Sequence, residues 1–187
     1  MVIRMIEDRS ILWKKFMDNP AKIGSCTPSS HYLAQRLLAP VPWHSINTIV
    51  ELGAGTGVFT KHIAAHKKYG STLLIVEQDP LMRSYLELCF PLCHFGSHAE
   101  NLPYLLRGLG LAHADCILSG LPISIFKAEQ RTMIMKRIHS SLSERGIFIT
   151  FQYSPMMSPL FRHYFRQVHI QFELRNIPPA FLFYCQK

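Results

Sequence analysis

The sequence predicts an α/β domain built on a seven-stranded, mostly parallel sheet that ends in an antiparallel strand pair, with helices on both faces. Three observations support this prediction. The chain has 187 residues, of which 48% are hydrophobic, so it is the size of one domain with a substantial core. Short apolar segments alternate with helical patterns from residue 46 to residue 153, which is typical of a parallel sheet. Two further apolar segments then follow each other through a short turn.

The alternating part begins with a buried strand and a glycine-rich turn. Strands are predicted over 46–52, 71–76, 93–96, 115–119 and 147–153, and helices between them over 60–66, 80–89, 102–109 and 127–142. The last two segments, 169–175 and 180–185, are joined only by residues 176–179. That connection is too short for a crossover helix, so these two strands should pair antiparallel.

Residues 1–45 precede the first strand, and the sheet does not require them. Val2, Ile6, Trp13 and Phe16 fall roughly on one face of a helix, with basic residues elsewhere, which predicts an amphipathic helix. A second short helix is predicted over 31–38. We therefore expect one domain over 1–187, with an N-terminal helical extension over 1–45 and the sheet over 46–187.

The chain is basic, and its apolar stretches are short. Lys and Arg number 20 against 12 Asp and Glu, giving a formal net charge of +8, which attracts phosphate-bearing surfaces and leaves both nucleic acid and anionic lipid open as partners. No stretch reaches the length of about 18–20 apolar residues that spans a bilayer, and the N-terminus lacks the features of a secretory signal. We expect a cytoplasmic protein.

The most informative motif lies between the first predicted strand and the helix that follows. Glu51 is followed by Gly53, Gly55 and Gly57, and glycines at this point allow a sharp turn and close approach of the backbone to a ligand. Glu77 ends the second predicted strand, where it is placed to accept hydrogen bonds from both hydroxyls of a ribose. Strand, glycine turn, helix, strand and acid in this order predict a nucleoside-binding site.

The Gly-x-Gly-x-Gly spacing, preceded by an acidic residue, resembles the class I S-adenosylmethionine-dependent methyltransferases, which share a Rossmann-like fold. The resemblance implies S-adenosylmethionine as the cofactor and places Glu51 near its methionine end. The predicted antiparallel strand pair is also similar to that family. A glycine turn that serves only to pack the helix on the strand is the alternative.

Further motifs outside the glycine turn resemble the bacterial phospholipid N-methyltransferases, which convert phosphatidylethanolamine stepwise towards phosphatidylcholine. They are Asn19 to Ser25, Pro28 to Ser30, Ser119 to Pro122, Tyr153 to Pro155 and Asn176 to Ala180. The match covers nearly the whole chain. It implies a phospholipid substrate. With such a substrate, the charge of +8 and the amphipathic, basic N-terminus predict an anionic membrane surface as a partner and peripheral membrane association. The same group is distantly similar to the rRNA adenine dimethylases.

Two positions depart from the related patterns. His98 stands where the family usually has the aspartate that meets the adenine amino group, so His98 either hydrogen-bonds adenine or is a surface residue. Adenine-directed methylases carry Asn-Pro-Pro-Tyr or a close relative after the fourth strand, whereas this chain has Ser119-Gly120-Leu121-Pro122. That segment lacks the amide and the stacking ring, so base methylation is disfavoured. Ser119 is also assigned to the cofactor site.

Tyr153 is the candidate catalytic residue, because it lies at the C-terminal end of the fifth predicted strand, close to the expected cofactor site. Its hydroxyl would orient the amine, helped by the carbonyl groups of residues 119–121; the alternative is that Tyr153 packs in the core. The amphipathic N-terminus either docks on a membrane or packs on the sheet. RNA and small-molecule amines remain alternative substrates, and a protein that binds without methylating remains a further alternative. We expect no metal site, because Cys89 to His98 spans a helix-to-strand change.

Overall fold

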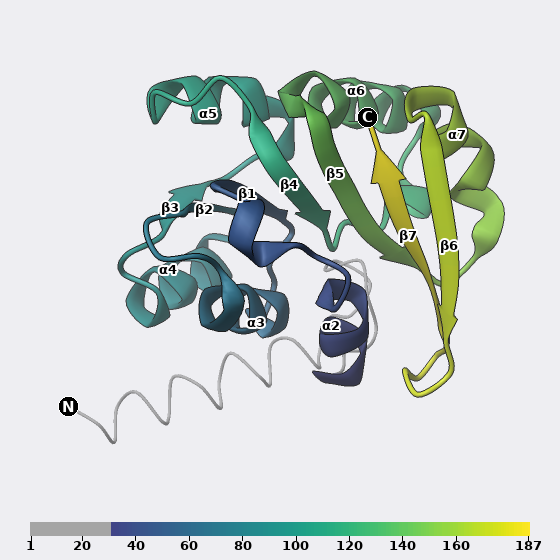
Figure 1. The fold of residues 1–187 in the computed structure, drawn as a ribbon, viewed down its shortest axis with the longest axis horizontal. Coiled ribbons are helices and arrows are strands. Elements are labelled where there is room, and N and C mark those ends of the chain that lie inside the picture. Colours follow the sequence, from purple (N-terminus) through teal and green to yellow (C-terminus); the bar gives the residue numbers. More distant parts are fainter. Residues whose placement is uncertain (1–30) are drawn as a thin grey trace.

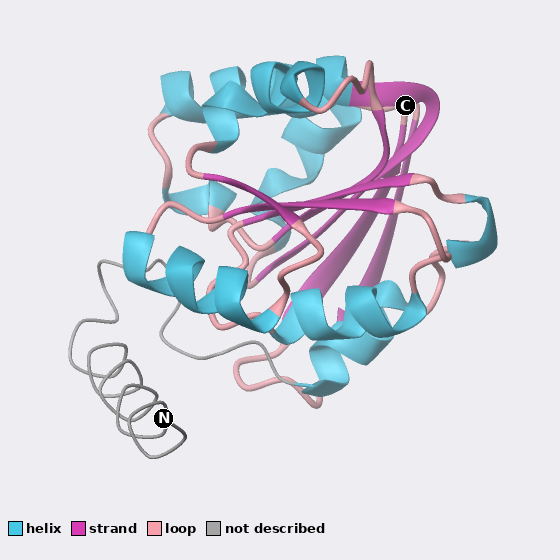
Figure 2. Ribbon diagram, turned by 90° about the vertical axis from the view of Figure 1, so that its left-hand side faces the viewer, coloured by secondary structure: helices cyan, strands magenta, loops and turns pink. Residues whose placement is uncertain are grey.

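The computed structural model describes residues 31–187, which form three layers: one sheet lies between two layers of helices (Figure 1, Figure 2). The predicted amphipathic helix of the N-terminus lies outside the described residues. The second predicted helix, α2 (His31–Leu38), is confirmed and is the first described element.

The sheet has seven strands in the order β3-β2-β1-β4-β5-β7-β6. Five are parallel, and β7 pairs antiparallel with both β5 and β6, as predicted. The strands are β1 (Thr48–Leu52), β2 (Thr72–Val76), β3 (His94–Gly96), β4 (Ala114–Ser119), β5 (Leu142–Gln152), β6 (Gln167–Glu173) and β7 (Ala180–Gln186). The helices that follow α2 are α3 (Val58–His66), α4 (Pro80–Cys89), α5 (Leu102–Gly108), α6 (Ala128–Ser141) and α7 (Ser158–Tyr164). Short 3₁₀ turns complete the described chain: η2 (Trp43–Ser45), η3 (Ala99–Asn101), η4 (Ile123–Ile125) and η5 (Pro155–Met157).

Each face of the sheet forms its own hydrophobic core, because successive side chains of a strand point to opposite faces. In β1, Ile49 packs with residues of α2, α3 and α4, whereas Val50 packs with residues of α5, α6 and α7. In β2, Leu73 belongs to the same core as Ile49, and Leu74 belongs to the same core as Val50. Strands buried on both faces read as continuous apolar runs, which is why the sequence predicted a covered parallel sheet.

The main difference from the prediction lies at the start of β5. We predicted a helix to residue 142 and a strand from 147, but α6 ends at Ser141 and β5 begins at once with Leu142. Leu142 is fully buried and pairs with Ala114, and the register with β4 then shifts before Ile147. The polar residues 143–145 and Gly146 suggested a turn, whereas they belong to an irregular part of the strand.

The carboxyl ends of β1 and β4 meet at the centre of the sheet, where the chain changes direction. The segment after β1 leads to β2 on one side, and β4 lies on the other side. Gly53 after β1 donates a backbone hydrogen bond to Val76 of β2, and Gly120 after β4 donates one to Leu52 of β1. In open α/β sheets ligands bind outside the carboxyl ends of the strands at such a switch point.

Within residues 31–187, no helix is long and apolar enough to cross a membrane.

Candidate functional site

The glycine turn after β1 forms an open loop at the switch point. Gly53, Gly55 and Gly57 all have positive φ angles, of 74°, 52° and 80°, in the region that L side chains rarely adopt. At Gly57 a Cβ atom would lie 2.7 Å from Leu86 Cδ2, so this glycine also lets α3 approach α4. At Gly55 a Cβ atom would meet nothing within 4 Å. The loop therefore presents its backbone to open space at Gly55, where a ligand has room to approach.

Glu77, directly after β2, joins the glycine loop to the neighbouring strand. One oxygen of its carboxylate accepts a hydrogen bond from the N–H of Gly55 at 2.7 Å, and the other accepts one from the N–H of Asp79 at 2.9 Å. The side chain of Glu77 is half-buried. Each carboxylate oxygen has a second lone pair, so Glu77 keeps the capacity to accept two more hydrogen bonds.

Glu51 lies beneath the loop and is almost completely buried, with 1% of its surface exposed. Thr60 of α3 donates its hydroxyl to Glu51 Oε2 at 2.7 Å, while Oε1 is buried and has no hydrogen-bond partner among the described residues. Burial raises the pKa of Glu51 to about 7; the hydrogen bond from Thr60 opposes this shift and the negative charge of Glu77 adds to it. The site therefore holds a carboxyl group that is only partly ionised at neutral pH and has one unsatisfied oxygen.

The other two predicted cofactor residues follow β3 and β4. His98 comes shortly after β3 and is exposed, and its Nδ1 lies 2.8 Å from the hydroxyl of Ser97. Ser119 ends β4 and is fully buried; its hydroxyl accepts a hydrogen bond from the N–H of Leu121 at 3.2 Å. All of the predicted cofactor residues thus lie at or near the carboxyl ends of β1 to β4, but Ser119 shapes the loop after β4 and does not present its side chain at the surface.

Tyr153 lies directly after β5, and its ring is 38% exposed. The ring packs edge-on against Phe151, with 5.9 Å between the ring centroids. Tyr153 therefore lies at the border of the core, with one part packed and one part exposed. The neighbouring loop after β4 is held by two hydrogen bonds from β5: Thr150 donates to the carbonyl of Ser119 and Gln152 donates to that of Leu121. The carbonyl of Leu121 also accepts a hydrogen bond from the N–H of Ile123, so both of its lone pairs are in use.

Sequence reasoning missed two polar side chains that support this site. Thr60 donates a hydrogen bond to one of the two oxygens of the Glu51 carboxyl group. Its position in the first turn of α3, directly after the glycine turn, was the only sequence feature that could have indicated this contact. Gln152 is 3% exposed and fixes the loop after β4 beside Tyr153. A polar residue at the end of an otherwise apolar strand was the signal there. The contact of Thr60 depends on α3 packing against β1, and that of Gln152 depends on β5 pairing with β4, so neither can be inferred from the sequence alone.

In the part of the chain that the structure describes, no three His, Cys, Asp or Glu side chains gather closely enough to hold a metal ion.

A curated relative decides the family. The ornithine lipid N-methyltransferase of Singulisphaera acidiphila is 30% identical to the chain over 186 residues, which cover 97% of each protein. The chain belongs to the same family of S-adenosylmethionine-dependent methyltransferases. The predicted resemblance, the enzyme class and the cofactor are thereby confirmed. A scan against protein-family models found no match.

Solved structures show the fold of the methyltransferase. The 1,6-didemethyltoxoflavin N1-methyltransferase of Burkholderia thailandensis, with S-adenosylhomocysteine bound, aligns with a TM-score of 0.71 at 16% identity over 96% of this chain and 86% of that one. An O-methyltransferase of Bacillus cereus, in complex with SAH, gives the same TM-score at 12% identity over 95% of this chain and 91% of its own. An rRNA methylase of Streptococcus thermophilus gives 0.59 at 13% identity over 82% and 94%. At these identities the similarity establishes the Rossmann-like fold alone.

The raised pKa of Glu51 predicts a pH-dependent difference in stability between the methyltransferase and its Glu51→Gln variant. In the unfolded chain this carboxyl group has its ordinary pKa of 4.5, so between about pH 5 and pH 7 the folded state binds more protons than the unfolded state. The stability contributed by this proton is present at low pH and is lost as the pH rises through 7. We expect the free energy of unfolding of Glu51→Gln, relative to the wild type, to increase by about 1–3 kcal/mol from pH 5 to pH 8.5.

Urea unfolding without added cofactor measures this difference. Glu87→Gln is the matched control, because Glu87 is exposed and forms only an i,i+4 ion pair with Arg83. If the difference between Glu51→Gln and the wild type is the same at both pH values, Glu51 is ionised in the folded protein at low pH and the account of its burial is wrong.

Proposed function

We propose that the methyltransferase transfers methyl groups to the headgroup amine of a membrane lipid such as phosphatidylethanolamine. The observation that carries this proposal is the relative that matches nearly the whole chain, whose name specifies N-methylation of an ornithine lipid. Ornithine and ethanolamine both end in a primary amine, so one site chemistry serves either headgroup. The motifs shared with phospholipid N-methyltransferases favour ethanolamine.

The residues at the switch point fit S-adenosylmethionine, which supplies a methyl group on a positively charged sulfonium when bound. The buried, unsatisfied oxygen of Glu51 suits the ammonium group at the methionine end, and a cation there would favour the ionised carboxylate. The free lone pairs of the Glu77 carboxylate suit the ribose hydroxyls. The open backbone at Gly55 leaves room between these groups, and the exposed His98 after β3 would meet the adenine.

The remaining task of the protein is to position the acceptor amine. An amine attacks only through a neutral lone pair, so the site must hold the nitrogen in line with the methyl group and let a proton leave. Tyr153 is the catalytic residue in this proposal: its hydroxyl accepts a hydrogen bond from the amine and orients it. The adjacent loop after β4, which Thr150 and Gln152 hold in place, bounds the acceptor site in this proposal.

Membrane association belongs to the same proposal. A lipid amine is presented at the surface of a bilayer, and the net charge of +8 draws the protein to an anionic surface, where each basic side chain near the membrane contributes about 1 kcal/mol. Methylation of RNA is the alternative that the same charge favours. It is disfavoured by the segment after β4, because Gly120-Leu121-Pro122 has no aromatic ring to stack on a base.

Incubation of the full chain with methyl-labelled S-adenosylmethionine tests the proposal. Three substrates are offered separately: vesicles of phosphatidylglycerol with phosphatidylethanolamine, total RNA, and soluble ethanolamine. We expect label in the lipid fraction of the vesicles, with products separated by chromatography according to the number of methyl groups added. Label in RNA or ethanolamine, with none in the lipid, would overturn the proposed substrate.

The role of Tyr153 predicts a loss of turnover in Tyr153→Phe. The substitution removes one hydrogen bond and keeps the ring that packs on Phe151, so the fold should survive and kcat should fall about tenfold. Tyr104→Phe is the matched control, because Tyr104 is an exposed tyrosine of α5 whose ring contacts Arg107. Unchanged kcat in Tyr153→Phe would leave the tyrosine with a packing role only.

A further inference from the structure

Four large apolar side chains protrude from the loops at one end of the sheet. We call Ile125, Met156, Leu174 and Ile177 the apolar rim; they are 67%, 74%, 70% and 79% exposed. None of them lies on an α-helix or a β-strand. Ile125 belongs to η4 after β4, Met156 belongs to η5 after β5, and the other two belong to the loop between β6 and β7.

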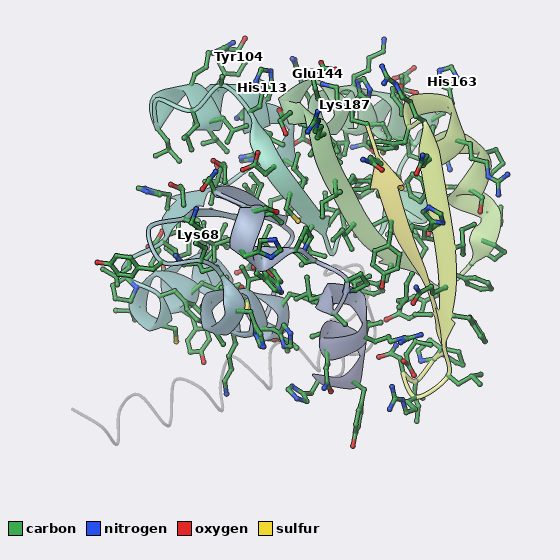
Figure 3. All side chains as sticks on the ribbon, in the orientation of Figure 1. Lys68, Tyr104, His113, Glu144, His163 and Lys187 are labelled. Atoms are coloured by element: carbon green, nitrogen blue, oxygen red, sulfur yellow. The ribbon has the colours of Figure 1, made fainter. Side chains whose placement is uncertain are left out.

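Strand pairing places all four at the carboxyl edge of the parallel sheet. The last residue of β4, Ser119, pairs with Thr150 near the end of β5. The last residue of β5, Gln152, pairs with Phe181 at the start of β7. The loop between β6 and β7 therefore lies beside Tyr153 and shares an edge with the candidate active site. Figure 1 shows this loop next to α2, and Figure 3 shows His113, Glu144 and Lys187 at the opposite edge.

The loop between β6 and β7 is held in shape, so it displays its apolar residues without depending on a partner. Asn176 is buried and donates its side-chain amide to the carbonyl of Pro178 at 2.7 Å. The guanidinium of Arg175 donates two hydrogen bonds to the carboxylate of Glu173, at 3.0 and 3.2 Å, and lies over the ring of Tyr32 from α2. The polar side chains of the loop are thus bound within the loop or lie against α2, whereas Leu174 and Ile177 are exposed to solvent.

Two exposed basic side chains lie on segments next to parts of the apolar rim. Arg36 of α2 and Lys127 after η4 are exposed, and neither forms an ion pair with any residue from 31 to 187. The acidic Glu173 is buried and already bound to Arg175. The acidic residue that follows η4, Glu129, lies at the start of α6 and is the counter-charge closest in sequence to Lys127. The rim thus lies near exposed cations that form no close ion pair, a pattern that suits the headgroup boundary of an anionic bilayer; Arg36 also interacts at longer range with the charge of Glu173.

We propose that the apolar rim inserts into the interfacial region of an anionic lipid bilayer and so opens the candidate active site towards the membrane. This inference rests on the proposed function, because a site that methylates a lipid headgroup must face the bilayer from the edge that carries Tyr153. It adds a docking surface distinct from the predicted N-terminal helix. Separate protruding side chains on three loops suit a fluid lipid interface better than the continuous packed surface of a protein partner.

Flotation of the full chain with vesicles of phosphatidylglycerol and phosphatidylethanolamine tests the docking surface. We expect Leu174→Ser with Ile177→Ser to lower the vesicle partition coefficient at least about tenfold, since two large aliphatic groups no longer leave water. The matched control is Tyr69→Ser with Leu92→Ser. These side chains are 100% and 96% exposed and precede β2 and β3, at the opposite edge of the sheet, so binding should stay at the wild-type level.

Hydrogen exchange locates the contact without any substitution. Vesicles should slow exchange at residues 153–157 and 174–179 and leave residues 67–70 and 90–93 unchanged. Three outcomes would overturn the proposal. The rim double variant could bind vesicles as well as the wild type, the control variant could lose as much vesicle binding as the rim variant, or the rim substitutions could change self-association and leave vesicle binding unchanged.

The labelled-methyl assay separates failure of the docking surface from failure of the proposed function. If the wild type binds vesicles through the rim but labels no lipid, the substrate is wrong and the docking surface stands. If the rim double variant labels vesicle lipid as fast as the wild type, the docking surface is wrong and the substrate stands.

Discussion

The close contact between Gly120 and the backbone of Gly53 is the constraint on which the arrangement of the site depends. A Cβ atom on Gly120 would lie 2.7 Å from the carbonyl oxygen of Gly53, so the loops after β1 and β4 touch backbone to backbone. The N–H of Gly120 is bound to the carbonyl of Leu52, which fixes the same approach from the other side. The loop after β1 carries the proposed cofactor contacts, and the loop after β4 is hydrogen-bonded to Gln152, the neighbour of the proposed catalytic Tyr153. The contact between the two loops therefore sets the distance between the two halves of the site.

The second constraint on the site is the buried carboxyl group of Glu51, whose charge is unfavourable in the folded protein. Glu51 is buried with one oxygen unsatisfied, and among residues 31–187 it is Thr60 that compensates its charge. An isolated buried carboxyl group disfavours the ionised form, and its raised pKa expresses that penalty. A cationic ligand above Glu51 would relieve it. The unsatisfied oxygen thus belongs with a binding site, because it contributes nothing to stability when the protein is alone.

Most of the fold was predictable from the sequence, because buried strands and the helices between them leave simple patterns. The seven strands and the antiparallel final pair follow from apolar runs and connection lengths, and Glu51 and Glu77 follow from their positions relative to the glycines. The start of β5 was not predictable, since residues 143–146 are polar and glycine-containing like a turn, and only pairing of Leu142 with Ala114 shows that the strand has begun. The contacts of Thr60 and Gln152, and the apolar rim, depend on which segments the sheet brings together.

The domain places its proposed chemistry and its proposed membrane contact at a single edge, with the contact between Gly53 and Gly120 at the centre. Binding of S-adenosylhomocysteine to Gly120→Ala, measured by calorimetry on protein shown to be folded, tests that contact most directly. Gly108→Ala is the control, because a Cβ atom at Gly108 meets nothing within 4 Å. A clash between backbone atoms has to be relieved by moving one loop, so we expect Gly120→Ala to bind at least about tenfold more weakly than the wild type and Gly108→Ala to bind normally. Wild-type affinity in folded Gly120→Ala would contradict the claim that this contact shapes the cofactor site.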